Sequence, residues 1–241
     1  MHRLASSLSL HRLASSLSLA GLLAVPGLLG AQVGHVPERS PFRDLDYRQE
    51  TTVFGGWYAA GEDYAGVAPK AGPITGVRYD IRLAGPVLFY VRAAGVVTER
   101  RVLDPAKAEA QRDLGTQSWP LGLFDTGFDF HVTGWRSYRG LVPLISAGVG
   151  VATDFKGTAD VGGFKFGTPF AISAGGGLKW VPGGRLQGRL DAVYRSHQIK
   201  YPDAYFLQSS DGTRILRETT PQSFWKANLS VTLGLTYLLF R

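Results

Sequence analysis

The sequence predicts an all-β protein: an antiparallel, up-and-down transmembrane β-barrel of about eight strands, preceded by a signal peptide. Three observations lead to this prediction. Apolar and polar residues alternate with a period of two through most of the chain after residue 50. The connections between the alternating segments are long and short in turn. No run of 18 or more apolar residues follows Ala31, so a membrane-spanning helix is not expected.

Residues 1–31 are predicted to be the signal peptide. The sequence HRLASSLSL occurs twice in tandem, at residues 2–10 and 11–19, and supplies a weakly basic start. An apolar stretch then runs to Ala31, and cleavage is expected after about that residue. The polar segment 32–50 is expected to be a loose periplasmic tail, and residues 51–241 are expected to form the barrel.

Eight segments are predicted to be strands, each close to the length that crosses a bilayer when tilted. They are 53–60, 74–83, 87–98, 122–133, 141–153, 169–180, 185–195 and 225–239. The last one alternates most regularly, because Leu229, Val231 and Leu233 share one face while Ser230 and Thr232 share the other. A count of eight or of ten strands is compatible with this pattern.

The polarity of the two faces distinguishes a membrane barrel from a soluble one. The polar face carries several arginines and aspartates, whereas the other face consists of Leu, Val, Ile, Phe, Tyr and Ala. Those apolar faces are too extensive for one small interior to bury, and lipid would cover them. Aromatic residues at strand ends are expected to form two belts at the membrane interfaces. They are Trp57, Tyr58 and Trp225 beside long loops, and Phe89, Trp180 and Tyr237 beside short turns.

Composition excludes several classes of protein. The 241-residue chain has no cysteine, so disulfide scaffolds, thiol catalysis and Cys-based zinc sites are excluded. The net charge is +7, but the basic residues are scattered and form no stripe, so a nucleic-acid partner is not expected. The five histidines show no metal-ligand spacing, and no cofactor is implied.

The charged residues of the polar faces are predicted to point into the barrel. An eight-stranded barrel is just wide enough for side chains to fill it, and buried charges must pair. We therefore expect an interior polar network that plugs the lumen. Its predicted members are Arg78, Asp80, Arg82, Arg92, Asp125, Asp129, His131, Lys179, Arg189, Asp191 and Arg195.

The final segment, TLGLTYLLFR, is similar to the C-terminal assembly signal of small outer-membrane barrels, and the chain from about residue 51 resembles the OmpA/OmpX kind. The residues that carry the similarity are Thr232, Gly234, Tyr237, Leu239 and Phe240, with Phe240 penultimate rather than terminal. The resemblance implies a location in the bacterial outer membrane, outer-membrane lipids and the barrel assembly machinery as partners, and a monomer.

Two alternatives to a non-enzymatic barrel remain open from the sequence. Some eight-stranded barrels modify lipid A as acyltransferases or deacylases and use a histidine near the outer rim, where His197 is expected. Ser196 is its neighbour and would point to the opposite face, so a catalytic partner would have to come from another strand. A narrow channel is the second alternative. The preferred function is structural, adhesive or receptor-like, with the long loops displayed outside.

The longest connection is predicted to contain a hairpin. Residues 204–218 consist of two short β-prone runs on either side of Asp211-Gly212, a dipeptide favoured in tight turns. The last two strands are therefore expected to continue beyond the membrane and to end near Asp211.

Overall fold

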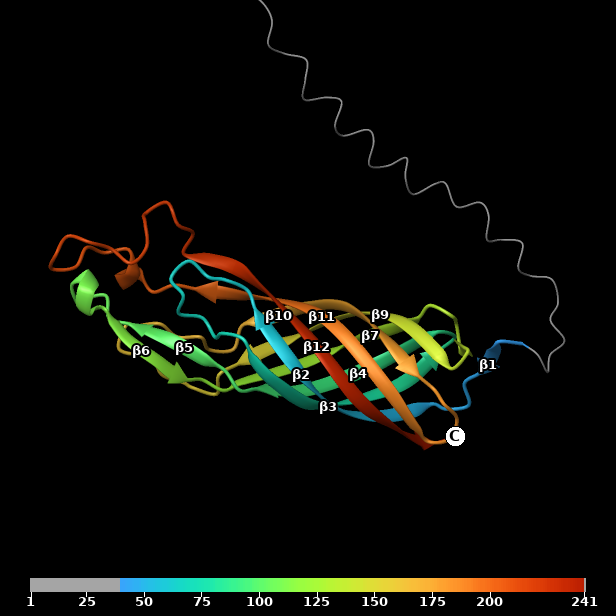
Figure 1. Cartoon of the computed structure of the whole chain (residues 1–241). Coiled ribbons are helices and arrows are strands. Elements are labelled where there is room, and N and C mark those ends of the chain that lie inside the picture. The colour runs from blue at the N-terminus through green and yellow to red at the C-terminus, as the bar shows by residue number, and fades with distance from the viewer. Residues whose placement is uncertain (1–39, 241) are drawn as a thin grey trace, which may run out of the picture. The chain divides into compact units, whose positions relative to one another are not determined.

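The computed structural model describes residues 40–240, in which eight long strands form a closed antiparallel barrel (Figure 1). The barrel strands are β2 (Gln49–Ala60), β3 (Gly72–Ala84), β4 (Val87–Val96), β7 (Leu121–His131), β9 (Leu141–Thr153), β10 (Phe170–Trp180), β11 (Leu186–Lys200) and β12 (Ser223–Phe240). Each pairs with its neighbours in chain order, and β12 closes the barrel by pairing with β2. The predicted fold and the eight strands are confirmed. The predicted signal peptide and its cleavage site lie outside the described residues.

The remaining elements are short and lie outside the barrel wall. β5 (Glu99–Leu103) and β6 (Asp113–Ser118) form a hairpin, and β1 (Phe42–Asp44) pairs with β8 (Arg136–Tyr138). Two 3₁₀ helices, η3 (Glu109–Gln111) and η4 (Asp203–Tyr205), interrupt the long connections. Within residues 40–240, no helix has the length and apolar character needed to cross a membrane.

The two ends of the barrel differ in the length of their connections. At one end, called the loop end, strands are joined by residues 61–71, 97–120, 154–169 and 201–222. At the other, called the turn end, they are joined by residues 85–86, 132–140 and 181–185. The predicted alternation of long and short connections is therefore present, with β2 starting and β12 ending at the turn end.

The barrel wall is apolar outside and polar inside. On β12, the side chain of Leu233 is 69% exposed while its neighbour Thr232 is 6% exposed and points inward. The same alternation places Val53 outside and Thr52 inside on β2. A water-soluble barrel would bury the apolar set, so this inverted arrangement is that of a barrel surrounded by lipid.

A pair of glycines makes room for an interior aromatic ring. Gly127 of β7 and Gly148 of β9 are register partners, and a Cβ atom at Gly148 would overlap the hydroxyl of Tyr90. The ring of Tyr90 in turn lies 3.8 Å below the guanidinium carbon of Arg78. Glycine at these positions thus helps to place a charged side chain inside the barrel.

The prediction of a hairpin within residues 204–218 is wrong. A turn forms over residues 209–212, where the Gly212 N–H donates to Ser209 O at 3.0 Å, but Gly212 (φ +76°) and not Asp211 has the positive φ that the predicted turn needs at both central positions. The flanking runs do not pair as strands, because Tyr205 and Leu216 are buried in an apolar cluster at the loop end. The hairpin that extends beyond the barrel is instead β5–β6, in the connection between β4 and β7.

Two further expectations are corrected near the N-terminus of the barrel. Residues 42–48 are not a loose tail, since β1 pairs with β8 and Leu45 and Tyr47 are buried at the turn end. Tyr58 does not belong to the outer aromatic belt, because it points inward and is buried, while Trp57 faces outward.

Candidate functional site: the charged lumen and its two caps

Arg189 is the centre of an ion-pair network in the turn-end half of the lumen. It is 2% exposed; its Nη2 donates to Asp129 Oδ2 at 2.8 Å and its Nε donates to Asp191 Oδ2 at 2.6 Å. Its Nη1 lies 3.7 Å from both Glu50 Oε1 and Asp80 Oδ1. One guanidinium therefore faces four carboxylates contributed by four different strands.

Arg78 and Lys179 supply the other positive charges of this network. Arg78 Nη2 contacts Asp80 Oδ1 at 2.7 Å and Asp129 Oδ2 at 2.6 Å, so Asp129 is shared between two arginines. Lys179 pairs with Glu50. Three basic and four acidic side chains, all of them buried, are thus packed together.

A second cluster lies toward the loop end and has the opposite imbalance. Asp125 accepts from Arg92 Nη2 at 2.8 Å and from Arg195 Nη2 at 2.5 Å. Two arginines share one carboxylate here. With the three basic and four acidic side chains of the first cluster added, the two clusters together contain five basic and five acidic groups. Because an uncompensated buried charge costs several kcal/mol, this balance is what allows the lumen to be charged at all.

The structure brings together most of the predicted interior residues, but not all in the expected way. Arg82 is half-buried at the turn end, where its guanidinium carbon lies 4.1 Å from the centre of the Trp135 ring. His131 is fully buried and stacks on Trp135 with ring centres 5.2 Å apart. Neither nitrogen of His131 is hydrogen-bonded to a described residue, so it does not belong to the aspartate clusters.

Glu50 belongs to the network, whereas the sequence predicts it in the N-terminal tail. It lies on β2 and is completely buried beside Lys179. The period-two pattern that joins Glu50 to the inward-facing Thr52 and Phe54 is the signal that could have identified it.

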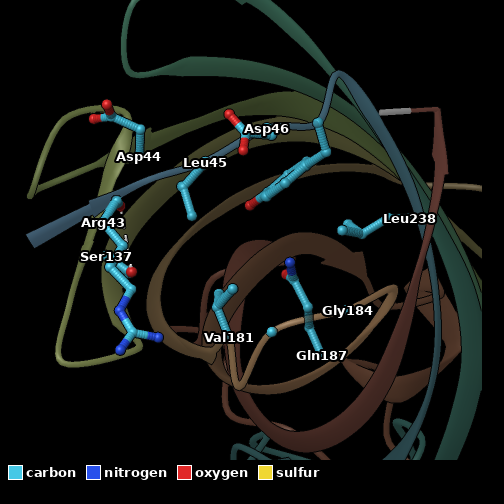
Figure 2. Close-up of a pocket in the computed structure, with 11 residues that line it drawn as sticks. Arg43, Asp44, Leu45, Asp46, Ser137, Val181, Gly184, Gln187 and Leu238 are labelled. Carbon is cyan, nitrogen blue, oxygen red and sulfur yellow. Dashed lines mark hydrogen bonds between the residues drawn. The ribbon is translucent and has the colours of Figure 1, made fainter.

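An apolar cluster closes the turn end. Leu45, Tyr47, Val142 and Leu238 are buried together, with Trp135 and Val181 packed against them. Trp135 Nε1 donates to the carbonyl oxygen of Leu45, which ties the N-terminal segment across the barrel mouth. Figure 2 shows Leu45, Val181, Gln187 and Leu238 around a cavity of about 110 Å³ at this end.

A larger apolar cluster closes the loop end. Ile74, Val96, Leu121 and Leu123 come from the barrel wall, and loop residues cover them. The loop residues are Val67, Phe164, Phe166, Tyr201, Tyr205 and Leu216. Burial raises the pKa of Tyr205 to about 12, and burial together with Asp63, which accepts from the Tyr201 hydroxyl at 3.0 Å, raises the pKa of Tyr201 above its usual value. Both phenols therefore stay neutral in this cap.

The β5–β6 hairpin is tied to the 201–222 loop through Asp211. Its carboxylate accepts hydrogen bonds from the Ser209 and Thr213 hydroxyls at 2.5 and 2.7 Å and from the Glu109 N–H at 2.7 Å. The same two hydroxyls accept from Arg112 Nη2. These bonds, with the hydroxyls contributing most, lower the pKa of Asp211 below its usual value.

We predict that Asp211→Ala detaches the loop from the hairpin and speeds tryptic cleavage after Arg214. At neutral pH the carboxylate is ionised and its hydrogen bonds are intact; since its pKa is lowered, this contribution is lost as the pH falls through that lowered value. Glu109→Ala is the matched control, because it removes a neighbouring carboxylate but keeps the N–H that bonds to Asp211. Equal cleavage rates for the two variants would show that the Asp211 carboxylate does not hold the 201–222 loop to the hairpin.

His197 is enclosed within the barrel and does not face lipid. It is 1% exposed, packs against Phe166, and its Nδ1 lies 3.4 Å from Asn228 Nδ2. Ser196 points to the opposite face. Within the described part of the chain, no group of three or more His, Cys, Asp or Glu side chains is arranged to hold a metal ion.

The residues of the C-terminal motif lie on β12, the strand that closes the barrel. Thr232 and Gly234 face the interior, while Tyr237 and Leu239 face outward at the turn end. The backbone of Phe240 pairs with Gln49 after an irregularity in the register.

Solved structures to which the chain is similar include three bacterial proteins. Neisserial surface protein A is 13% identical with a TM-score of 0.43, and the match covers 83% of this chain and 98% of that protein. Outer membrane protein OprG from Pseudomonas aeruginosa is 10% identical with a TM-score of 0.45, with 81% and 98% covered. Ail, the attachment invasion locus protein of Yersinia pestis, solved with sucrose octasulfate, is 13% identical with a TM-score of 0.34, with 79% and 99% covered.

No protein-family model and no curated protein matches the chain. The assignment of the fold therefore depends on the geometry itself. The closed barrel of eight antiparallel strands, apolar outside and charged inside, has the architecture of a small transmembrane β-barrel.

Proposed function

We propose that the protein is a monomeric, non-enzymatic barrel of the bacterial outer membrane that acts through its loop end, as an adhesive, receptor-like or structural surface protein. The observation that supports this most strongly is the closure of the lumen at three levels. Apolar clusters cover both ends, and ion pairs cross the lumen between them. In a barrel closed in this way, the outer surface and the loops are the parts that a partner can contact.

The loop end carries the exposed surface that a partner could contact. The β5–β6 hairpin projects beyond the barrel wall, and all six residues of β6 are exposed. Its contacts with the 201–222 loop hold it in one arrangement, so a partner would meet an ordered surface. Long connections of such barrels face the outside of the cell, so we assign the loop end to the extracellular side. Insertion would use the barrel assembly machinery, through the C-terminal motif on β12.

We predict that a single cysteine at the hairpin tip is labelled on intact cells. Ala106→Cys places a thiol on an exposed loop-end residue, and Ala84→Cys places one on an exposed turn-end residue, in a chain that has no other cysteine. A membrane-impermeant maleimide should react with the first variant on intact cells and with the second only after the outer membrane is breached. The reverse result would invert the proposed orientation.

Two measurements test the closed, non-enzymatic character. Planar-bilayer recordings of the purified protein should show no conductance above that of an empty bilayer, and steady channel openings would contradict the closed lumen.

Mass spectra of lipid A from cells with and without the protein should be identical, and a mass shift of one acyl chain would establish a lipid A-modifying enzyme instead.

A further inference from the structure

β12 extends further toward the loop end than β2, the strand with which it closes the barrel (Figure 1). Their last register pair at that end is Asn228 with Ala60. Residues 223–227 pair with β11 on one side, but no described strand pairs with them on the β2 side. Alternate N–H and C=O groups of this edge therefore lack a strand partner, and the barrel wall has a notch.

A cleft occupies this notch. It consists of two adjoining cavities of about 490 and 280 Å³ that share Gly61, Glu62, Asp63 and Lys226. The larger cavity is also lined by Tyr64, Phe224, Trp225 and Ala227. Tyr64 and Trp225 expose about half or more of their surface, so aromatic rings stand at the opening on the outer wall.

Lys226 lines both cavities. The residue is 3% exposed, and its Nζ donates to the carbonyl oxygen of Pro69 at 2.9 Å. Among residues 40–240, no carboxylate lies within ion-pair distance of its Nζ, although Asp63, which lines the same cavities, is near enough to stabilise the charged form. An ammonium can donate three hydrogen bonds, so this buried cation retains the capacity to bind an anionic oxygen.

The cleft lies at the outer edge of the apolar belt. Trp225 and Tyr237 are twelve residues apart on β12, about 40 Å along the strand, and a tilt of about 40° reduces this to about 30 Å, the thickness of a hydrocarbon core. Trp225 is the register partner of Gln198, and the outward-facing residues at and beyond that level, Gln198 and Lys200, are polar and exposed. This is the depth at which lipid phosphates lie.

We propose that the cleft binds the phosphate-bearing head group of an outer-leaflet lipid. A phosphate oxygen would accept from Lys226 Nζ, and N–H groups of the β12 edge at residues 223–227, where β2 does not pair, would provide further donors. Lys200 on the adjacent strand adds a second positive charge at the same level, and Trp225 and Tyr64 flank the glycerol and upper acyl region. The proposal depends on the loop end facing outward, as assigned above.

The test follows the Trp225 indole N–H resonance of the full-length protein in dodecylmaltoside micelles. Dihexanoylphosphatidylethanolamine should shift this resonance in a saturable manner and should give intermolecular NOEs to it. Dihexanoylglycerol, which has no phosphate, should do so at least about tenfold more weakly, since a charge-assisted contact contributes about 1.5–3 kcal/mol. Inorganic phosphate alone should also bind much more weakly, because it lacks the glycerol and acyl contacts.

Variants assign the effect to Lys226. Lys226→Met should raise the apparent Kd at least about tenfold, while Lys226→Arg should remain within about threefold of the wild type. Lys165→Met is the matched control, because it removes the same charge from an exposed position on another loop. Heat-modifiable mobility on a gel checks that each variant is a folded barrel; if Lys226→Met is not, the wild-type NOEs and the three-ligand comparison decide.

Equal binding of dihexanoylglycerol, or of free phosphate, would overturn the lipid head group as the occupant. Equal weakening by Lys165→Met would overturn the cleft as its site. These failures are distinct from failure of the proposed function, since inverted cysteine labelling or channel conductance would contradict that function whatever the lipid titration shows.

Discussion

Replacing Arg189 by methionine is expected to lower the free energy of unfolding by about 3–5 kcal/mol, the cost of breaking a buried ion-pair network. The guanidinium contacts Asp129 and Asp191 directly and lies within ion-pair distance of Glu50 and Asp80. Without it, four buried carboxylates would be left with Arg78 and Lys179. Urea titration of the protein refolded into lipid vesicles measures the change.

Arg43→Met is the control for this prediction, since it removes an exposed arginine at the turn end and should change stability by less than about 0.5 kcal/mol. Adding Asp129→Leu to Arg189→Met should restore part of the loss, because it removes one of the unpaired charges. If Arg189→Met lowers the free energy of unfolding no more than Arg43→Met does, the ion pairs described do not stabilise the barrel.

Placing an arginine at Leu233 is expected to cost about 2–4 kcal/mol, because the side chain would enter lipid near the middle of the membrane. Leu233 is the most exposed of the apolar residues at positions 225–239 of β12, and its neighbours on the same face are Val231 and Leu235. Refolding into vesicles, followed by the loss of heat-modifiable mobility in urea, measures the change.

Leu83→Arg provides the depth control. Leu83 is also outward-facing and exposed, but it lies at the turn end of β3, where the cost should fall to about 0–1 kcal/mol. Similar costs at the two positions would show that Leu233 is not covered by lipid. A Thr232→Arg variant, whose side chain starts inside the barrel, tests the register, because a one-residue slip would exchange its effect with that of Leu233→Arg.

The sequence by itself determined the barrel and the facing of its strands. A period of two is a local property, so the inward positions of Arg78, Asp129 and Arg189 could be assigned without knowing their neighbours. The lengths of the connections are equally visible in the chain, and they predicted the two unlike ends. The position of Glu50 could have been predicted in the same way had the alternation been followed before residue 51.

Tertiary structure decided what depends on residues far apart in the chain. Which arginine meets which aspartate follows from the register between strands, so Arg82 was placed in the network although it stacks on Trp135 at the turn end. The runs on either side of Asp211-Gly212 do not form strands, although a turn lies between them, because Tyr205 and Leu216 are buried in the cluster at the loop end. The notch beside Lys226 likewise arises from the unequal ends of β2 and β12, which come from opposite ends of the barrel sequence and meet only when the barrel closes.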